Sequence, residues 1–370
     1  LMMFKVLKRE LVKWIDDNKT EFAKKAKEYL YPGMRENKTE DIFERHGYIF
    51  PSQLNVKNLG KPFDAFNPGA KLKGKKLSVY PRVVFDHVRY VSSIGYFELD
   101  IEEVLNKRVR NPIECDLLLY ATEYWERRKG CEDPRIFSKN GKDYILYTAI
   151  GDWTYKNKKV EIDALACAQF RDNKCLRKDY FLLSSGDGET FLTFSNKDAC
   201  ILDLYKEDAS ILLRPEFIIN GVDALENKVR ICWRGRADLD RMVIYDMEPI
   251  MGTEKFEEKV GISTNAIQIG ADEFLISWHG KSRLDFYYRN GFGIVDKDGN
   301  LLGITKKYLL EPDKNNPLEM LGSYIGVIFP CGMIEYKDRI ILFAGVGDKR
   351  IGIFSAEKDK ILERIEWLEE

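Results

Sequence analysis

The sequence has 370 residues and a mass of 43.1 kDa, which suits a closed all-β architecture or two ordinary domains. It contains 59 basic and 60 acidic residues, so its formal charge of -1 gives no general attraction to nucleic acid or to an anionic membrane. Hydrophobic residues make up 44% and charged residues 32%, and no apolar run reaches the roughly 18 residues of a membrane helix; disordered and helical membrane proteins are excluded.

The first element expected along the chain is helical. Between Phe4 and Leu30 apolar residues recur near a 3.6-residue period, which predicts one or two amphipathic helices that end at Tyr31-Pro32-Gly33. We therefore expect residues 1–62 to form a helical N-terminal extension and linker, which either contacts a second copy in a homo-oligomer or packs on its own domain. The opening residues lack the apolar region and cleavage site of a signal peptide, so we expect a cytoplasmic protein.

After Phe66 the sequence becomes a series of short β-rich runs separated by turn residues. Related units recur near residues 66–100, 131–171, 192–247, 262–297 and 324–357. This recurrence predicts an all-β fold, a five-bladed β-propeller catalytic domain over residues 63–357. A two-sheet sandwich is the alternative, disfavoured because the spacing is even and no long Greek-key return is seen. Apolar residues at Ile361, Leu362, Ile365 and Leu368 predict a C-terminal helix over residues 358–370.

The seven cysteines and three histidines show no spacing typical of a metal site. We expect reduced, mostly buried thiols and no metal. No glycine-rich nucleotide loop precedes a helix, so we expect no nucleotide cofactor either.

The most informative motif is Glu132-Asp133-Pro134-Arg135, which opens a strand-like segment. Pro134 biases Asp133 toward an extended backbone, so the carboxyl group would be held at a stiff strand entrance. A common turn with a solvated ion pair would give the same four residues. The motif also resembles the Glu-Asp-Pro-Arg signature of glycoside hydrolase family 130, the β-mannoside phosphorylases and related β-mannosidases.

The resemblance continues through all five units, from about residue 64 to residue 357. Its further motifs are Asn67-Pro68-Gly69-Ala70, Tyr80-Pro81-Arg82, Asn196-Lys197-Asp198-Ala199, Leu213-Arg214-Pro215, Lys259-Val260-Gly261, Trp278-His279-Gly280 and Gly345-Val346-Gly347-Asp348. The insertion of Pro81 between Tyr80 and Arg82 departs from the family pattern.

The roles that this resemblance implies fall into three groups. Asp133 would be the general acid. The sugar would be bound by Asn67, Arg82 and Asp348, and phosphate by Lys197, Arg214, Lys259 and His279.

Taken one at a time, the basic residues of the phosphate group are weak signals. A single Lys or Arg is usually a solvated surface charge, and a lone histidine on a strand is more often a satisfied core group than a catalyst. A propeller would bring four such groups to one place, where like charges are costly without an anion. We therefore expect an anion, inorganic phosphate, between them.

These observations lead us to expect an enzyme for inverting phosphorolysis of terminal β-mannosides, giving α-mannose 1-phosphate and a shortened saccharide. Inverting hydrolysis needs a second carboxylate to activate water, whereas phosphate needs only positioning and charge neutralisation. The expected partners are a β-mannoside oligosaccharide and phosphate, which is a co-substrate; no cofactor is expected. A β-mannosidase and a non-catalytic carbohydrate-binding propeller remain as alternatives.

Overall fold

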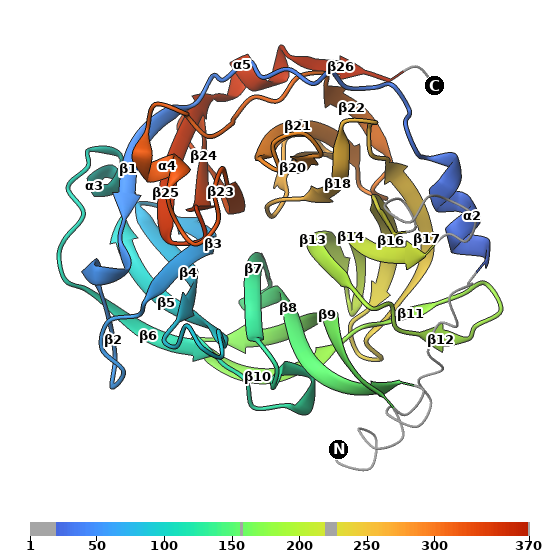
Figure 1. Cartoon of the computed structure of the whole chain (residues 1–370), viewed down its shortest axis with the longest axis horizontal. Coiled ribbons are helices and arrows are strands. Elements are labelled where there is room, and N and C mark those ends of the chain that lie inside the picture. The colour runs from blue at the N-terminus through green and yellow to red at the C-terminus, as the bar shows by residue number, and fades with distance from the viewer. Residues whose placement is uncertain (1–19, 156–157, 219–227, 369–370) are drawn as a thin grey trace.

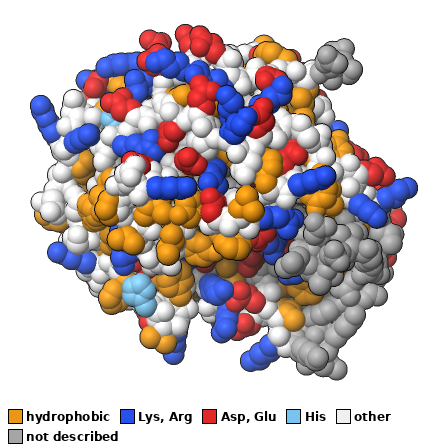
Figure 2. Space-filling model, turned by 45° about the horizontal axis from the view of Figure 1, so that its top comes forward, with side chains coloured by type: hydrophobic (Ala, Val, Ile, Leu, Met, Phe, Trp, Pro, Cys, Tyr) orange, Lys and Arg blue, Asp and Glu red, His pale blue; other side chains and the backbone are white. Residues whose placement is uncertain are grey.

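A computed structural model of the protein describes residues 20–155, 158–218 and 228–368. Most of these residues lie in β-strands, which form four sheets arranged around a common centre (Figure 1). The mainly β architecture expected from the sequence is thereby confirmed. In a space-filling view, acidic and basic side chains gather at a hollow beside an area of hydrophobic side chains (Figure 2).

The largest sheet has nine strands and consists of two runs, which are antiparallel except for one parallel pair of strands at the edge of the first run. The runs are joined by one parallel pair, Ser92 with Gly130. The first run contains β3 (Asp64–Lys73), β4 (Lys76–Val84), β5 (Ser92–Asp100) and β6 (Ile113–Leu119), with β2 (Leu54–Val56) beside β6. The second contains β7 (Gly130–Lys139), β8 (Lys142–Tyr155), β9 (Lys158–Arg171) and β10 (Lys174–Tyr180).

Two further sheets follow in chain order. The seven-stranded sheet contains β11 (Leu182–Ser184), β12 (Thr190–Phe191), β13 (Asn196–Tyr205), β14 (Asp208–Ile218), β15 (Lys228–Arg230), β16 (Cys232–Asp238) and β17 (Val243–Met251). The six-stranded sheet contains β18 (Glu257–Ile262), β19 (Ile267–Gln268), β20 (Glu273–Ser282), β21 (Tyr288–Asp296), β22 (Leu301–Thr305) and β26 (Ile365–Trp367).

The four-stranded sheet pairs a strand from the N-terminal region with strands from the C-terminal region. It contains β23 (Ile328–Tyr336), β24 (Arg339–Val346), β25 (Arg350–Glu357) and β1 (Glu44–Ile49), and β1 runs antiparallel to β25. The segment expected as a linker therefore supplies a strand to this sheet. The short helices are α2 (Thr20–Glu28), α3 (Ile101–Leu105), α4 (Pro317–Met320), α5 (Lys358–Leu362), η1 (Pro51–Gln53) and η2 (Tyr124–Glu126).

The C-terminal segment differs from the helix expected over residues 358–370. The helix α5 ends at Leu362, and β26 then pairs with β22. Ile361 and Ile365 are both buried, so the spacing that suggested a continuous helix is satisfied by one helical segment followed by a strand. Residues 369–370 lie outside the described part.

The N-terminal helix packs on its own chain. Residues 1–19, which include most of the helical region expected from the sequence, lie outside the described residues. In α2 the ring of Phe22 stacks on Phe217 at 5.5 Å and meets Trp233 edge-on at 5.9 Å. Beyond α2, the buried Arg35 donates to Glu257 at 2.5 Å, so this segment is tied to the six-stranded sheet.

The strands β3, β7, β13, β18 and β23 lie nearest the common centre (Figure 1). Hydrophobic residues fill the space between the sheets, where Trp233 and Trp278 are fully buried. The cysteines are free thiols, and all but Cys175 are buried. In the part of the chain that the structure describes, none of the helices has the length and apolarity needed to cross a bilayer.

Candidate active site

Three inner strands bend at matching positions and turn a polar side chain toward the centre. The residues Asn67, Asp133 and Asp198 have φ values of 45°, 52° and 52°, and each lies at a register shift in its strand. Asn and Asp tolerate this left-handed conformation better than most residues, and a bulge re-aims the side chain that it carries. The extended backbone expected for Asp133 from Pro134 is therefore wrong, because a bulge overrides the local preference.

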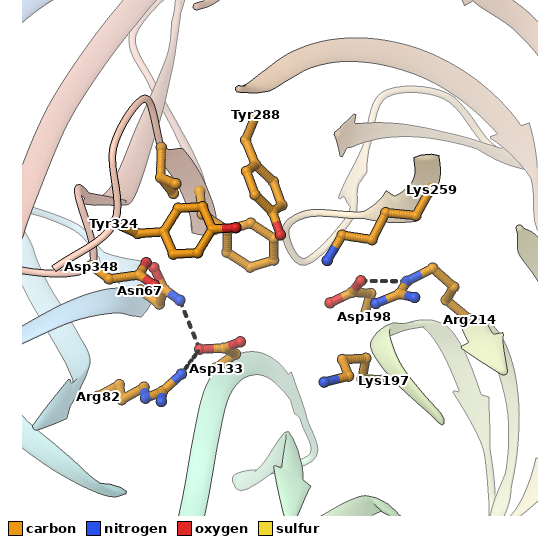
Figure 3. Close-up of a pocket in the computed structure, with 12 residues that line it drawn as sticks. Asn67, Arg82, Asp133, Lys197, Asp198, Arg214, Lys259, Tyr288, Tyr324 and Asp348 are labelled. Atoms are coloured by element: carbon orange, nitrogen blue, oxygen red, sulfur yellow. Dashed lines mark hydrogen bonds and ion pairs between the residues drawn. The ribbon is translucent and has the colours of Figure 1, made fainter. Parts of the chain in front are cut away.

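Asp133 receives two hydrogen bonds on one carboxyl oxygen. Its Oδ1 atom accepts from Asn67 Nδ2 at 2.8 Å and from Arg82 Nη1 at 3.3 Å (Figure 3). The residue is buried, with 8% of its surface exposed. A Cβ on Gly345 would lie 1.8 Å from Asn67 Oδ1, so only glycine leaves room for this arrangement. The three residues predicted from separate motifs thus meet at one point.

Arg82 connects Asp133 to the neighbouring carboxyl group. Its Nη2 atom lies 2.6 Å from Glu132 Oε1, its Nε atom donates to Ser92 Oγ at 2.9 Å, and its guanidinium stacks on Phe66 at 4.7 Å. Burial raises the pKa of Glu132 to about 7, with the charge of Asp133 acting in the same direction and Arg82 opposing both. Glu132 is thus a buried carboxyl that takes up a proton near neutral pH.

Asp348 reaches the same pocket from the turn between β24 and β25. It has a φ of 49° and follows Gly347. Burial raises the pKa of Asp348 to about 6, the Asp133 charge adds to this effect, and Arg82 opposes it. Figure 3 shows Asn67, Arg82, Asp133 and Asp348 on one side of the pocket.

Three basic side chains line the other side of the pocket (Figure 3). Lys197 Nζ is held by Asp163 Oδ2 at 2.6 Å, and Arg214 Nε by Asp198 Oδ2 at 2.6 Å. Lys259 Nζ lies 4.9 Å from the centre of the Tyr288 ring. Burial and the Arg214 charge lower the pKa of Lys259 to about 7. Of the predicted phosphate ligands, these three are brought together.

His279 does not line this pocket. Its side chain is fully buried, its Nδ1 atom lies 3.1 Å from Ser263 Oγ, and its Nε2 atom lies 3.5 Å from Asp198 Oδ2. The ring packs on Phe329 at 4.6 Å. Burial lowers the pKa of His279 well below its ordinary value, so the imidazole is neutral. The structure places it behind the basic group and outside the pocket lining.

Two charged residues of the site, Asp198 and Arg135, were assigned no role from the sequence. Asp198 Oδ1 accepts from Arg135 Nη2 at 3.2 Å, in addition to the Arg214 contact on Oδ2. Burial opposes ionisation, but the charges of Arg214 and Arg135 hold the pKa of Asp198 well below its usual range. The sequence did carry a signal for Asp198: like Asp133, it follows a charged residue near the start of an inner strand.

Arg135 ties this group to the six-stranded sheet. Its Nε atom donates to the Ser263 carbonyl oxygen at 2.8 Å, and its Nη1 atom donates to the Asp133 carbonyl oxygen at 2.9 Å. The Arg135 side chain therefore braces β7 and β13 against β18. Tyr288, Tyr324, Val327 and Phe329 complete the lining with largely apolar surface.

The pocket has an empty volume of about 560 Å³ including its open mouth, which is in the range of small-molecule sites, roughly 300–1,000 Å³. Within residues 20–155, 158–218 and 228–368, no group of three or more His, Cys, Asp or Glu residues is arranged to hold a metal ion. The arrangement offers a buried carboxyl group on one side and three cations on the other, which suits acid catalysis opposite an anion.

Comparison with known proteins adds independent findings. A family model described as β-1,4-mannooligosaccharide phosphorylase matches residues 33–367. A β-1,2-mannobiose phosphorylase of Thermoanaerobacter sp. (strain X514) is 27% identical over 281 residues, which cover 74% of this chain and 80% of that protein.

Solved structures show the same fold at lower identity. The β-1,2-mannobiose phosphorylase of Listeria innocua, solved with β-1,2-mannobiose, has a TM-score of 0.61 at 18% identity and covers 82% of this chain and 92% of its own. A structure from work on family 130 glycoside hydrolases that target β-1,2 mannosidic linkages in Candida mannan has a TM-score of 0.62 at 17% identity, with coverages of 85% and 95%.

Proposed function

The chain belongs to glycoside hydrolase family 130, and we propose that it catalyses the inverting phosphorolysis of a terminal β-mannoside. Family membership and an enzymatic function, both expected from the motifs, are confirmed by the family match over residues 33–367. In the proposed reaction phosphate attacks the anomeric carbon while Asp133 protonates the leaving oxygen. The products are α-mannose 1-phosphate and a saccharide one residue shorter.

The observation that carries this proposal is the group of cations facing Asp133 across the pocket. Within the described residues, no carboxylate pairs with Lys259, and the adjacent Glu258 pairs with Lys281 at 2.8 Å instead. Lys259, Lys197 and Arg214 are close enough for Arg214 and Lys197 to depress the pKa of Lys259. An anion in their midst removes this repulsion, and phosphate fits because Arg offers a forked donor and Lys a point charge.

The same geometry disfavours hydrolysis. A water nucleophile needs a carboxylate base on the side opposite the acid. The two carboxylates that contact these cations are already occupied: Asp198 by Arg214 and Arg135, and Asp163 by Lys197 at 2.6 Å. Phosphate is already an oxyanion and needs no such base, so positioning and charge neutralisation suffice.

The sugar would lie between the two groups. Asn67, Arg82 and Asp348 line the pocket beside Asp133 and offer donors and acceptors to the mannose hydroxyl groups. Tyr288 and Phe329 offer aromatic faces to its apolar C–H surface. We propose that the acceptor sugar leaves toward the pocket mouth, where Tyr324 lies.

We also propose that the two runs of the nine-stranded sheet count as separate blades. With the three other sheets they make five blades, and the inner strands β3, β7, β13, β18 and β23 each face the centre. The single parallel pair between Ser92 and Gly130 supports this division, because a continuous sheet would pair over several residues.

The test is release of mannose 1-phosphate from β-1,2- and β-1,4-mannobiose, with and without inorganic phosphate. Phosphate-dependent product is expected, and free mannose formed without phosphate would make the enzyme a β-mannosidase. Asp133→Asn should lower turnover by at least about a thousandfold, in the range of general acid catalysis. Asp152→Asn, which changes an exposed carboxylate on β8, is the matched control and should keep full activity.

A further inference from the structure

A second pocket lies beside the first and shares only its cationic side. Lys197, Arg214 and Lys259 line both pockets. None of the residues that surround Asp133 on the sugar side lines the second one, whose other walls come from β9, the residues just before β13, and β14 with β15. We call this space the phosphate-side pocket; its empty volume is about 810 Å³, including its open part.

The phosphate-side pocket leads from solvent to the buried cations. Lys228, at its outer part, has a side chain that is 54% exposed, whereas the Arg214 side chain at its inner end is 2% exposed. Lys197 lies between these extremes at 24%. The lining of this pocket therefore runs from the exposed Lys228 to the buried Arg214 and includes none of the residues on the Asp133 side.

The charge of this pocket favours an anion. Its lining has five basic and three acidic side chains. Glu216, one of the acids, is neutralised by Lys228 at 3.0 Å and by Arg230 at 2.7 Å. A cleft with one excess sign of charge raises the local concentration and the association rate of the opposite ion.

We propose that the phosphate-side pocket is a separate entrance for inorganic phosphate. The inference rests on the proposed phosphorolysis. A mannoside bound against Asn67, Asp133 and Asp348 fills the first pocket and closes that approach to the cations. Phosphate then enters and leaves past Lys228 while the sugar stays in place, so the two substrates bind in either order.

The first experiment measures phosphate binding directly, so it does not depend on turnover. The Asp133→Asn variant is mixed with inorganic phosphate in a stopped-flow instrument, with and without saturating β-1,2-mannobiose, and tryptophan fluorescence is followed. We expect the two association rate constants to agree within about threefold, because bound mannobiose would not block an entrance at Lys228. A reduction of tenfold or more with mannobiose bound would overturn the proposal.

A pair of charge reversals separates the two routes. Lys228→Glu should slow phosphate association several-fold, because it places a negative charge at the proposed entrance. Arg89→Glu, the same change in the exposed loop that carries Tyr90 over Arg82, should leave it unchanged. If Arg89→Glu slows phosphate and Lys228→Glu does not, phosphate uses the sugar opening and the inference is wrong.

Different results test the proposed phosphorolysis and the proposed phosphate entrance. Phosphate-independent release of mannose by the wild-type enzyme would refute phosphorolysis even if an anion enters past Lys228. Absence of phosphate binding to both the wild type and Asp133→Asn would refute the entrance as well.

Discussion

Asp198 holds Arg214 in place: its Oδ2 atom accepts from Arg214 Nε at 2.6 Å, and only 2% of each side chain is exposed. The bond involves Nε, which leaves the outer guanidinium nitrogens directed at the pocket that Arg214 lines (Figure 3). Asp198 does not itself have to touch phosphate to matter for its binding. It acts as a positioning residue.

Asp198→Asn should weaken phosphate binding more than sugar binding. The neutral amide loses the charge-assisted bonds to Arg214 and Arg135, so the KM for phosphate should rise at least about tenfold, consistent with a loss of about 1.5–3 kcal/mol. The KM for the mannoside should change much less. Steady-state kinetics with each substrate varied in turn give both values.

The matched control is Asp203→Asn on the same strand, where the side chain is 55% exposed and pairs with Lys139. It should leave both KM values unchanged. An equal rise in the two KM values for Asp198→Asn would show a general loss of structure and contradict the positioning role.

Gly261→Ala, on β18 beside the Asp198 side chain, should also weaken phosphate binding. A Cβ at this position would lie 2.6 Å from Asp198 Oδ2, 2.8 Å from His279 Cε1 and 3.0 Å from Arg214 Nε. These atoms belong to a packed, buried group, so they must move apart, and overpacking of this kind costs about 1–3 kcal/mol. We expect a lower melting temperature and a raised KM for phosphate.

Gly186→Ala is the comparison, because nothing lies within 4 Å of the added atom. Thermal unfolding should show a lower melting temperature for Gly261→Ala than for Gly186→Ala. A Gly261→Ala protein with wild-type stability and phosphate KM would show that the Asp198 group tolerates displacement.

Phosphate binding should weaken as the pH rises above about 7. Burial and the Arg214 charge lower the pKa of Lys259 to about 7 in the free protein, so Lys259 loses its charge above that pH. Sulfate is the better probe, because it keeps two negative charges across this range. Its inhibition constant should rise several-fold between pH 6 and pH 9, measured from competition with phosphate.

Lys259→Arg should flatten this dependence, because the guanidinium stays charged throughout. Lys281→Arg, a change at the residue that pairs with Glu258, should keep the wild-type profile. A sulfate inhibition constant in wild type that does not change with pH would contradict the assigned role of Lys259.

The sequence motifs predicted which residues meet. Three of them place Asn67, Asp133 and Asp198 near the starts of inner strands that converge, and the others lie on the neighbouring strands and turns. They did not predict that His279 is buried. His279 pairs with Gly261 in the register of β18 and β20, and its ring fills the space that this glycine leaves beside Asp198. Which face of a strand carries the histidine depends on register with a distant strand, and no local motif encodes that.

The backbone conformation of Asp133 was predicted wrongly for a related reason. The preference of a residue before proline is local and modest, whereas the bulge at Asp133 is stabilised by bonds from Asn67 and Arg82, which are distant in sequence. The strands β1 and β26 were missed because each pairs with a strand that is distant in sequence, β1 with β25 and β26 with β22. Short segments with weak patterns take up strand structure only when a partner edge is available.

Glu132→Gln should stabilise the protein at high pH relative to the wild type. The pKa of Glu132 is raised, mainly by burial, from 4.5 to about 7, so the folded state holds a proton that the unfolded state releases. Wild-type stability from this group is therefore full below about pH 4.5, falls as the pH rises toward 7, and stays low above it. Glutamine does not titrate and keeps an acceptor oxygen for Arg82 Nη2.

The difference in free energy of unfolding between Glu132→Gln and the wild type should shift in favour of the variant between pH 4.5 and pH 8, by on the order of 1–3 kcal/mol. Urea unfolding at several pH values gives this difference. Glu114→Gln, at an exposed position on β6 that contacts Asn55, should show no such trend. A constant difference for Glu132→Gln across this range would mean that Glu132 stays ionised beside Arg82, and that the Arg82 charge outweighs burial.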